Sequence, residues 1–506
     1  MQGSSQPDRQ LLDAAALCRH LLGDGSVHAF LAEHRRAVFP DELFADLFPS
    51  GRGRPSVPAD VIATTMVLQA LEGLSDRQAV RRLETDIAWK AAAGLALTDE
   101  AFHSTVLVLW RNKLRASERP QRIFDAVRAV ITSSGVIANK TRRALDSTVL
   151  DDAVQRQDTV TMLVTQIRRV RRLVPGLGSV WVREHNLEPG GPPVDWEDPA
   201  DVDRLVSELV DDANELVWAA EDLDLDDDQT AAVALLALVA GQDVEPGDGP
   251  GQWRIARRTA PDRVVSSVDP ESRHTHKTSH SYRDGYKAHV AAEPETGLVT
   301  DCDLTPGNTA DAGAAPGLVD DEPEGTEVLG DSAYGSGELR DHLAATNKKA
   351  TIKPPPLRPA VPGGFTLDDF ELDDADGTLT CPAGVAVRLS TKGRADYGAN
   401  CAGCPLRRRC TTAADGRVVV LHPHHRLLVA ARAQAATDEF DAVYRRWRPM
   451  VERSLAWLTR GANRKLRYRG VERNRLWWSH RCAAVNLQRL LALGLVAGDD
   501  GAWAIG

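Results

Sequence analysis

Three carboxylates in this chain have the residue types and surroundings needed for divalent-metal chemistry. Asp146 lies within a short β-like run, Asp331 ends another such run, and Glu452 lies in a helical stretch. Mg²⁺ prefers hard oxygen ligands, and carboxylates suit Mn²⁺ as well. Two such ions held about 3.5–4 Å apart stabilise both the attacking and the leaving oxygen of an in-line displacement. We predict that these three residues are catalytic metal ligands, although each alone could be an ordinary loop carboxylate.

The elements that must position these carboxylates follow a definite order along the chain. The run with Asp146 is followed by a hairpin at 285–305, a strand ending at Asp331 and, after an insertion, the helix of Glu452. This is the order of an RNase H-like fold, in which the two strand carboxylates lie side by side. We therefore expect an α+β or α/β architecture whose catalytic domain contains an RNase H-like mixed sheet.

The N-terminal part has helical periodicity. Apolar residues recur over 58–72, Ser75 with Gln78 forms a capping-box signature for a helix reaching about Gly94, and Thr98 can cap a third helix. Three short helices with tight turns are typical of a helix-turn-helix-like DNA-binding module. A plain helical bundle would give the same pattern.

Charge is distributed unevenly. Fifteen acidic residues and one arginine lie between 195 and 228, while the whole chain has a net charge of −11, so the remainder carries +3. Residues 444–481 contain twelve Lys/Arg and two Glu. This asymmetry favours a polyanionic partner despite the acidic total. The acidic stretch is more simply a solubilising helical surface, with a partner-binding or DNA-mimicking face as the alternative.

Two groups of basic residues are candidates for DNA contact. Arg445 and Arg448 precede Glu452 by seven and four residues, so a continuous helix would place all three on one face, where arginine can grip a phosphate. The second group, a dense basic stretch, is predicted to contact the DNA backbone and includes Arg464, Lys465, Arg467 and Arg469. The alternative is a solvated basic helix face.

Four of the seven cysteines lie close together in the sequence, at Cys381, Cys401, Cys404 and Cys410. Four thiolates can hold a structural Zn²⁺, and the Cys401–Cys404 spacing is that of a zinc knuckle. Reduced unligated thiols or a redox-sensitive pair remain the alternatives. The histidines at 422, 424 and 425 are interpreted as loop or DNA-proximal residues that could also serve as ligands, and those at 274, 276 and 280 as residues of an exposed or DNA-facing loop.

Length and composition favour a multidomain protein with no membrane span. No secretory signal begins the chain, so a cytoplasmic location is expected. Residues 246–262 read as a loop, and 354–435 as irregular. The expected domains are a helical, helix-turn-helix-like DNA-binding domain at 1–135, the RNase H-like core at 140–156 and 263–353, a helical acidic insertion at 157–262, a Cys-containing insertion at 354–435 and a C-terminal helical part at 436–495.

These features together resemble the DDE transposases of bacterial insertion sequences, in the subgroup with a helical N-terminal domain and a cysteine-bearing insertion. The resemblance extends from about 28 to 493. Its collinear motifs are GRPS at 53–56, LDST at 145–148, DPESR at 269–273, GYK at 285–287, GDSAYG at 330–335, CPAG at 381–384, CAGCPLR at 401–407, RRWR at 445–448, VE at 451–452 and RYRG at 467–470.

The resemblance implies recognition of terminal inverted repeats in double-stranded DNA, metal-dependent cleavage at the element ends and strand transfer into target DNA. It also implies a homo-oligomer that pairs two DNA ends. An RNase H-like nuclease without strand transfer, and a non-catalytic DNA-binding protein derived from a transposase, are the alternatives.

Overall fold

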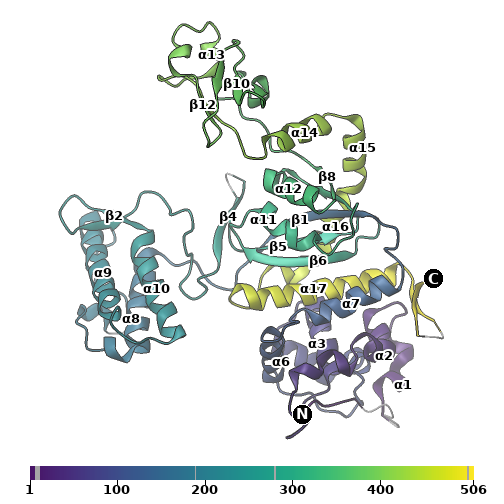
Figure 1. The fold of residues 1–506 in the computed structure, drawn as a ribbon. Helices are drawn as coiled ribbons and strands as arrows, with labels where there is room; N and C mark the ends of the chain where they lie inside the picture. Colours follow the sequence, from purple (N-terminus) through teal and green to yellow (C-terminus); the bar gives the residue numbers. More distant parts are fainter. Residues whose placement is uncertain (6–11, 188–189, 279–280, 499–500) are drawn as a thin grey trace.

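The centre of the protein is a curled, mixed six-stranded sheet (Figure 1). This computed structural model describes residues 1–5, 12–187, 190–278, 281–498 and 501–506. One path through the sheet runs β4-β5-β1-β7-β8, and β6 also pairs with β5. The strands are β1 (Arg142–Asp151), β4 (Arg273–Thr278), β5 (Ser281–Ala292), β6 (Val299–Pro306), β7 (Glu327–Gly330) and β8 (Lys349–Ile352).

Strand direction and register decide where the carboxylates lie. β5 is antiparallel to β1 and β6, whereas β7 runs parallel to β1 with Ala144 opposite Leu329. Asp146 and Asp331 each come two residues after this pair, so they lie at the same level on neighbouring parallel strands. The predicted hairpin and the strand before Asp331 are confirmed.

Helices cover both faces of the sheet. One face packs on α11 (Asp311–Val319) and α12 (Gly337–Ala345) around Leu145, Val328 and Ile352. The other face packs on α16 (Pro449–Leu458) and α17 (Val471–Ala492), which bury Trp477 and Trp478. α17 begins directly after Gly470, which has φ +85° and ends the preceding loop.

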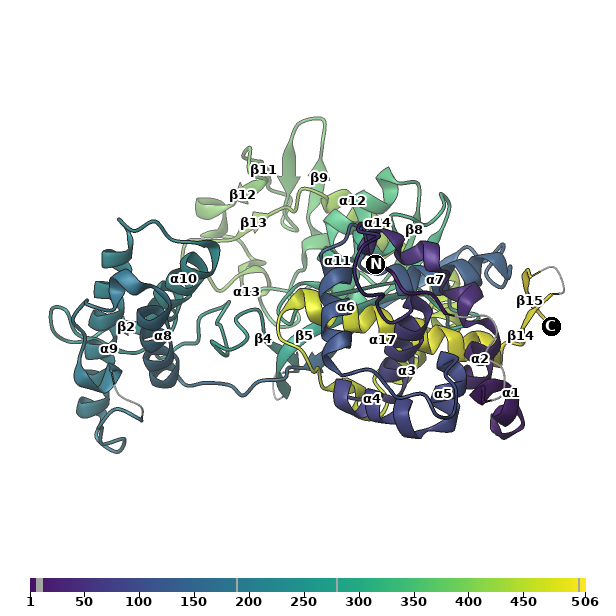
Figure 2. The ribbon, with the colours of Figure 1, turned by 90° about the horizontal axis from the view of Figure 1, so that it is seen from below.

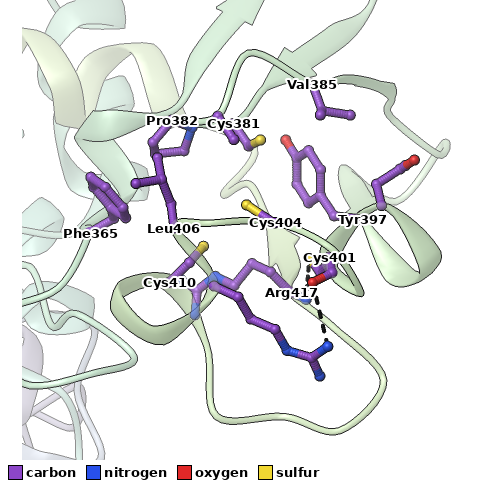
Figure 3. A pocket seen from close by; sticks show the side chains of 13 residues that line it. Phe365, Cys381, Pro382, Val385, Tyr397, Cys401, Cys404, Leu406, Cys410 and Arg417 are labelled. Carbon is purple, nitrogen blue, oxygen red and sulfur yellow. Dashed lines mark hydrogen bonds between the residues drawn. The ribbon is translucent and has the colours of Figure 1, made fainter.

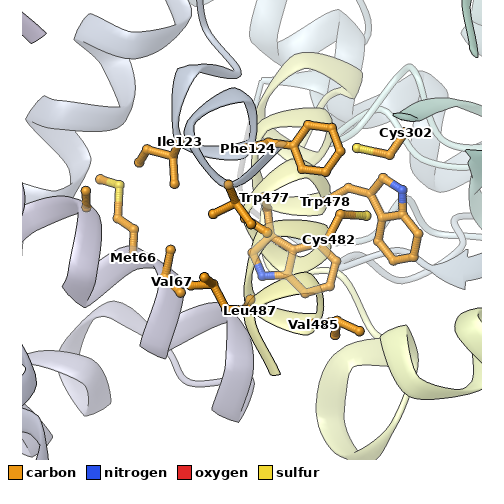
Figure 4. Close-up of a cluster of buried hydrophobic side chains, with 14 of the residues drawn as sticks. Met66, Val67, Ile123, Phe124, Cys302, Trp477, Trp478, Cys482, Val485 and Leu487 are labelled. Atoms are coloured by element: carbon orange, nitrogen blue, oxygen red, sulfur yellow. The ribbon is translucent and has the colours of Figure 1, made fainter. Parts of the chain in front are cut away.

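α17 also joins the sheet to the N-terminal helices, and Figure 4 shows the shared core, in which Met66 and Phe124 face α17. A long helix that contacts partners on two sides must be apolar over most of its circumference. The N-terminal helices are α1 (Ala14–Cys18), α2 (Val27–Val38), α3 (Ala59–Glu72), α4 (Asp76–Thr85), α5 (Ile87–Ala93), α6 (Thr105–Arg115) and α7 (Arg122–Ser133).

The N-terminal predictions are confirmed in part. α3 ends at Gly73 in the left-handed conformation, and Ser75 with Gln78 forms the expected capping box. The helix predicted to continue to Gly94 instead breaks at Asp86, whose carboxylate caps α5. Thr98 caps no helix, since the chain remains a loop until α6 begins at Thr105.

Residues 157–262 fold as a separate helical unit beside the sheet (Figures 1 and 2). Its helices, α8 (Thr159–Leu173), α9 (Pro199–Ala220) and α10 (Asp227–Gln242), enclose a core of their own. The segment 246–262 is not wholly a loop, because β2 (Val244–Pro246) and β3 (Trp253–Ile255) pair as a short hairpin.

The cysteine-bearing segment is more ordered than the sequence indicated. It contains two small sheets, and the segment then ends in α14 (His425–Ala435), which packs against α12. Its elements are β9 (Glu371–Asp373), β10 (Thr378–Thr380), β11 (Ala386–Arg388), β12 (Arg394–Asp396), α13 (Arg407–Cys410) and β13 (Val418–Val420). These strands are only three residues long, too short to give a clear periodicity.

The C-terminal part begins with α15 (Asp438–Trp447), and only Arg448 separates it from α16. Arg448 keeps right-handed helical dihedrals, and Pro449 fits the first turn of α16 because a backbone donor is not needed there. The final hairpin consists of β14 (Leu495–Ala497) and β15 (Trp503–Ile505). No described helix is both long enough and apolar enough to cross a membrane.

Candidate active site

The three predicted carboxylates converge on one guanidinium group. Arg448 Nη2 lies 3.0 Å from Asp146 Oδ1 and 3.7 Å from Asp331 Oδ2, and Arg448 Nη1 lies 3.4 Å from Glu452 Oε1. β1, the end of β7 and the first turn of α16 supply the carboxylates, so segments more than 300 residues apart in the sequence build the site.

Local structure fixes each carboxylate. Asp146 accepts a hydrogen bond from the Ser147 amide at 2.9 Å, and Asp331 accepts one of 2.9 Å from the Ala333 amide. Glu452 lies in the first turn of α16, where the helix dipole favours a negative charge. The apolar side chains of this helix, Val451, Leu455 and Leu458, are buried and anchor it to the core.

The site opens from a buried floor towards solvent. Side-chain exposure is 5% for Arg448, 15% for Asp146, 44% for Asp331 and 66% for Glu452. Burial raises the pKa of Asp146, and the charge of Arg448 opposes this shift. Burial disfavours the Arg448 cation, but the attractions of Asp146, Tyr444 and Asp331 together raise the pKa of Arg448.

The donor set fits a hard divalent cation. Three carboxylates with one arginine leave an excess of negative charge, and the two outer carboxylates are open to an incoming ion. In the arrangement seen here Arg448 lies between them, and among the described residues no three His, Cys, Asp or Glu side chains are grouped closely enough to hold a metal ion.

The structure adds residues to this site that the sequence did not single out. Asp311, at the start of α11, accepts a 2.7 Å hydrogen bond from Ser147 Oγ and lies 3.3 Å from Lys287 Nζ. Lys353 follows β8, is exposed, and places Nζ 4.4 Å from the centre of the Tyr444 ring. Lys353 could have been found from the sequence, because it directly follows a short strand that runs parallel to the strand before Asp331.

The predicted DNA-binding residues are divided by the fold. Arg448 is buried among the carboxylates, whereas Arg445 is 80% exposed and pairs with Asp441 instead. The prediction that Arg445, Arg448 and Glu452 share one helix face is therefore wrong, because the side chain of Arg448 turns inwards and that of Arg445 does not. Of the basic stretch, Arg464, Lys465 and Arg469 are exposed, while Arg467 donates a hydrogen bond to the Gly73 carbonyl.

The histidine predictions also change. His274 and His276 belong to strand β4 and not to a loop, and His274 Nδ1 lies 2.6 Å from Asp284 Oδ1. His280 lies outside the described residues. His422 and His424 pair with Glu338 and Asp341 on α12 at 3.0 and 3.6 Å, away from the cysteines.

Two family models match the chain. Residues 26–113 match the family described as transposase domain (DUF772), and residues 380–491 match the family described as transposase DDE domain. The second match includes Glu452 and the four clustered cysteines but neither Asp146 nor Asp331. No curated protein and no solved structure matches.

Two separate stretches of the chain are therefore similar to transposase domains. Taken together, the two matches confirm the resemblance and are consistent with a DDE transposase of an insertion sequence.

Proposed function

We propose that this transposase cleaves DNA at the ends of its element and joins the freed ends to target DNA, using Asp146, Asp331 and Glu452 as ligands for Mg²⁺ or Mn²⁺. The observation that carries the proposal is the convergence of these three carboxylates on Arg448, within 3.0–3.7 Å. Side chains so distant in sequence meet where β7 ends beside β1, and Asp331 and Glu452 are exposed enough for a phosphodiester to approach.

We further propose that the sheet and its helices form an RNase H-like catalytic domain. The strand order β6-β5-β1-β7-β8, with the first three strands antiparallel and the last two parallel to β1, supports this assignment. In this proposal the helical unit at 157–262 and the cysteine-bearing segment at 354–435 are insertions, and residues 1–135 form the N-terminal DNA-binding domain.

Divalent cations bound at the site would stabilise charge on the attacking and leaving oxygens and make a bound water more acidic. The protein's own part is to hold the carboxylates together. Arg448 offsets their mutual repulsion from below, where burial strengthens electrostatic interactions. Hydrolysis and strand transfer each exchange one oxygen for another at phosphorus, so one set of carboxylates serves both steps.

Double-stranded DNA is the proposed substrate, bound by the exposed basic side chains. Lys353 lies beside the site, and Arg464, Lys465 and Arg469 lie on the loop before α17. A groove of about 640 Å³ runs along this loop between Lys465 and Ser75 of the N-terminal region. We propose that a homo-oligomer acting in the cytoplasm pairs the two element ends.

An assay with Mg²⁺, an end-containing donor DNA and a target plasmid tests this function. Wild-type protein is expected to give cleaved donor and joined product. Asp331→Asn is expected to lower cleavage at least about 100-fold, because one metal ligand loses its charge, while DNA binding stays unchanged. The matched control is Asp341→Asn, an exposed aspartate on the neighbouring helix α12.

Each other outcome has a defined meaning. Cleavage without joined product would favour the nuclease alternative, and DNA binding with neither reaction would favour the non-catalytic one. Unchanged cleavage by Asp331→Asn would refute the assignment of the metal ligands.

A further inference from the structure

The four clustered cysteines line one small cavity in the cysteine-bearing segment. The cavity has a volume of about 20 Å³, room for roughly one water-sized body. Its lining includes Cys381, Cys401, Cys404 and Cys410, which come from three separate stretches of the segment. Figure 3 shows the sulfurs of Cys381, Cys404 and Cys410 turned towards the same space.

Two tight turns present three of these thiols, and Cys410 ends α13. After Cys381, the Gly384 amide donates to the Cys381 carbonyl at 2.8 Å, and Gly384 has φ +79°, a conformation that favours glycine. The second turn carries Cys401 and Cys404. The Arg417 amide donates to Cys401 Sγ at 3.4 Å, a contact that stabilises negative charge on sulfur.

The surrounding unit has only a small apolar core. This core contains eight buried residues, and two of them are cysteines. Small units of this kind are marginally stable and are commonly reinforced by a disulfide or a metal ion. None of the seven cysteines, all of which the structure describes, forms a disulfide.

We propose that Cys381, Cys401, Cys404 and Cys410 bind one structural Zn²⁺, which holds the fold of residues 365–421. Four thiolates provide the tetrahedral sulfur set that zinc prefers, with no open position for catalysis. The sulfurs seen here are not yet grouped closely enough to hold an ion, so binding must draw the two turns together. The site is independent of the metal chemistry proposed at Asp146.

Elemental analysis of the purified full-length protein tests the proposal. About one zinc per chain is expected for the wild type. Cys404→Ser should lose most of this zinc, whereas Cys18→Ser, a partly exposed cysteine on α1, should retain it. Replacement of zinc by Co²⁺ should give the absorption bands of a tetrahedral thiolate site. Wild-type protein with no zinc and four reactive clustered thiols, or with a disulfide among them, would overturn the proposal.

A second measurement on wild-type protein covers the case in which Cys404→Ser fails to fold. Removal of zinc with a chelator should expose new proteolytic sites within 365–421 and leave cleavage in the N-terminal helices unchanged, because only the cysteine-bearing unit depends on the ion. Re-addition of zinc should restore the resistance of residues 365–421 to proteolysis. An unchanged digestion pattern after proven zinc loss would contradict a structural role.

Discussion

At the scale of single residues, the environment of the Arg448 side chain differs most from what the sequence predicted. Its position four residues before Glu452 suggested a phosphate contact, yet its side chain is almost wholly buried beneath the three carboxylates. A buried cation requires nearby negative charge, and clustered carboxylates require a counter-ion. In this arrangement Arg448 meets both requirements.

Arg448→Ala should therefore destabilise the metal-free protein by roughly 3 kcal/mol, because Asp146 loses its partner in a partly buried setting. Mg²⁺ should raise the melting temperature of this variant more than that of the wild type, since no guanidinium competes for the carboxylates. Thermal unfolding with and without Mg²⁺ measures both effects. The matched control is Arg445→Ala, an exposed arginine whose loss should change stability by less than about 0.5 kcal/mol. Equal responses of the two variants would contradict this role for Arg448.

At the scale of elements, the contact between α7 and β6 contains buried charge. Asp301 on β6 lies 3.8 Å from Arg128 on α7, which also pairs with Asp125 at 4.0 Å. Burial raises the pKa of Asp301 to about 6, although Arg128 opposes the shift. We therefore expect the packing of the N-terminal helices on the sheet to depend on pH.

The sign of this pH dependence follows from the raised pKa. In the unfolded chain the pKa of Asp301 should be near its usual value of about 3.9, so folding favours the protonated form. The stability contributed by this proton is complete below about pH 4 and is lost as the pH rises through about 6. Asp301→Asn should gain up to roughly 3 kcal/mol relative to wild type between pH 4 and pH 7.5.

Urea unfolding of both proteins at pH 4 and pH 7.5 measures this gain. Asp320→Asn, which changes a half-exposed aspartate after α11, serves as the control and should show no comparable gain. A difference between Asp301→Asn and wild type that is the same at both pH values would argue against the raised pKa.

At the scale of the whole molecule, acidic and basic regions occupy different bodies. The acidic residues 195–228 belong to the helical unit around α9, which stands apart from the sheet (Figure 2). The exposed basic residues lie on the loop before α17, where Tyr468 Oη lies 3.3 Å from Asp76 Oδ1 of α4. This loop therefore connects the N-terminal region to the candidate active site.

Removal of one exposed charge on this loop should weaken DNA binding in a salt-dependent way. For Lys465→Ala, the slope of log affinity against log salt concentration should become shallower by about 0.9, the value for one lost phosphate contact. Fluorescence anisotropy with a duplex at several salt concentrations gives the slope. The control is Arg172→Ala, which removes an exposed arginine on α8 of the acidic unit and should leave the slope unchanged. Equal slopes for Lys465→Ala and wild type would place the DNA elsewhere.

Some features could be predicted from the sequence because they depend on local chemistry. The capping box at Ser75 and the hairpin of β5 and β6 both follow from residues close together in the chain. The break at Asp86 and the short strands of the cysteine-bearing segment were missed. At Asp86 a side-chain cap outweighed the helical periodicity on which the prediction rested, whereas strands of three residues are too short to show a periodicity.

The sequence by itself singled out three candidate carboxylates, because their residue types and the order of their elements can be read along the chain. Only the tertiary structure decided that Arg448 turns inwards, that Arg445 does not, and that Lys353 and Asp311 join the site. The physical reason is that such contacts depend on burial and on the register between strands and helices far apart in sequence. The spacing of residues along the chain specifies neither the burial of a side chain nor the register between distant elements.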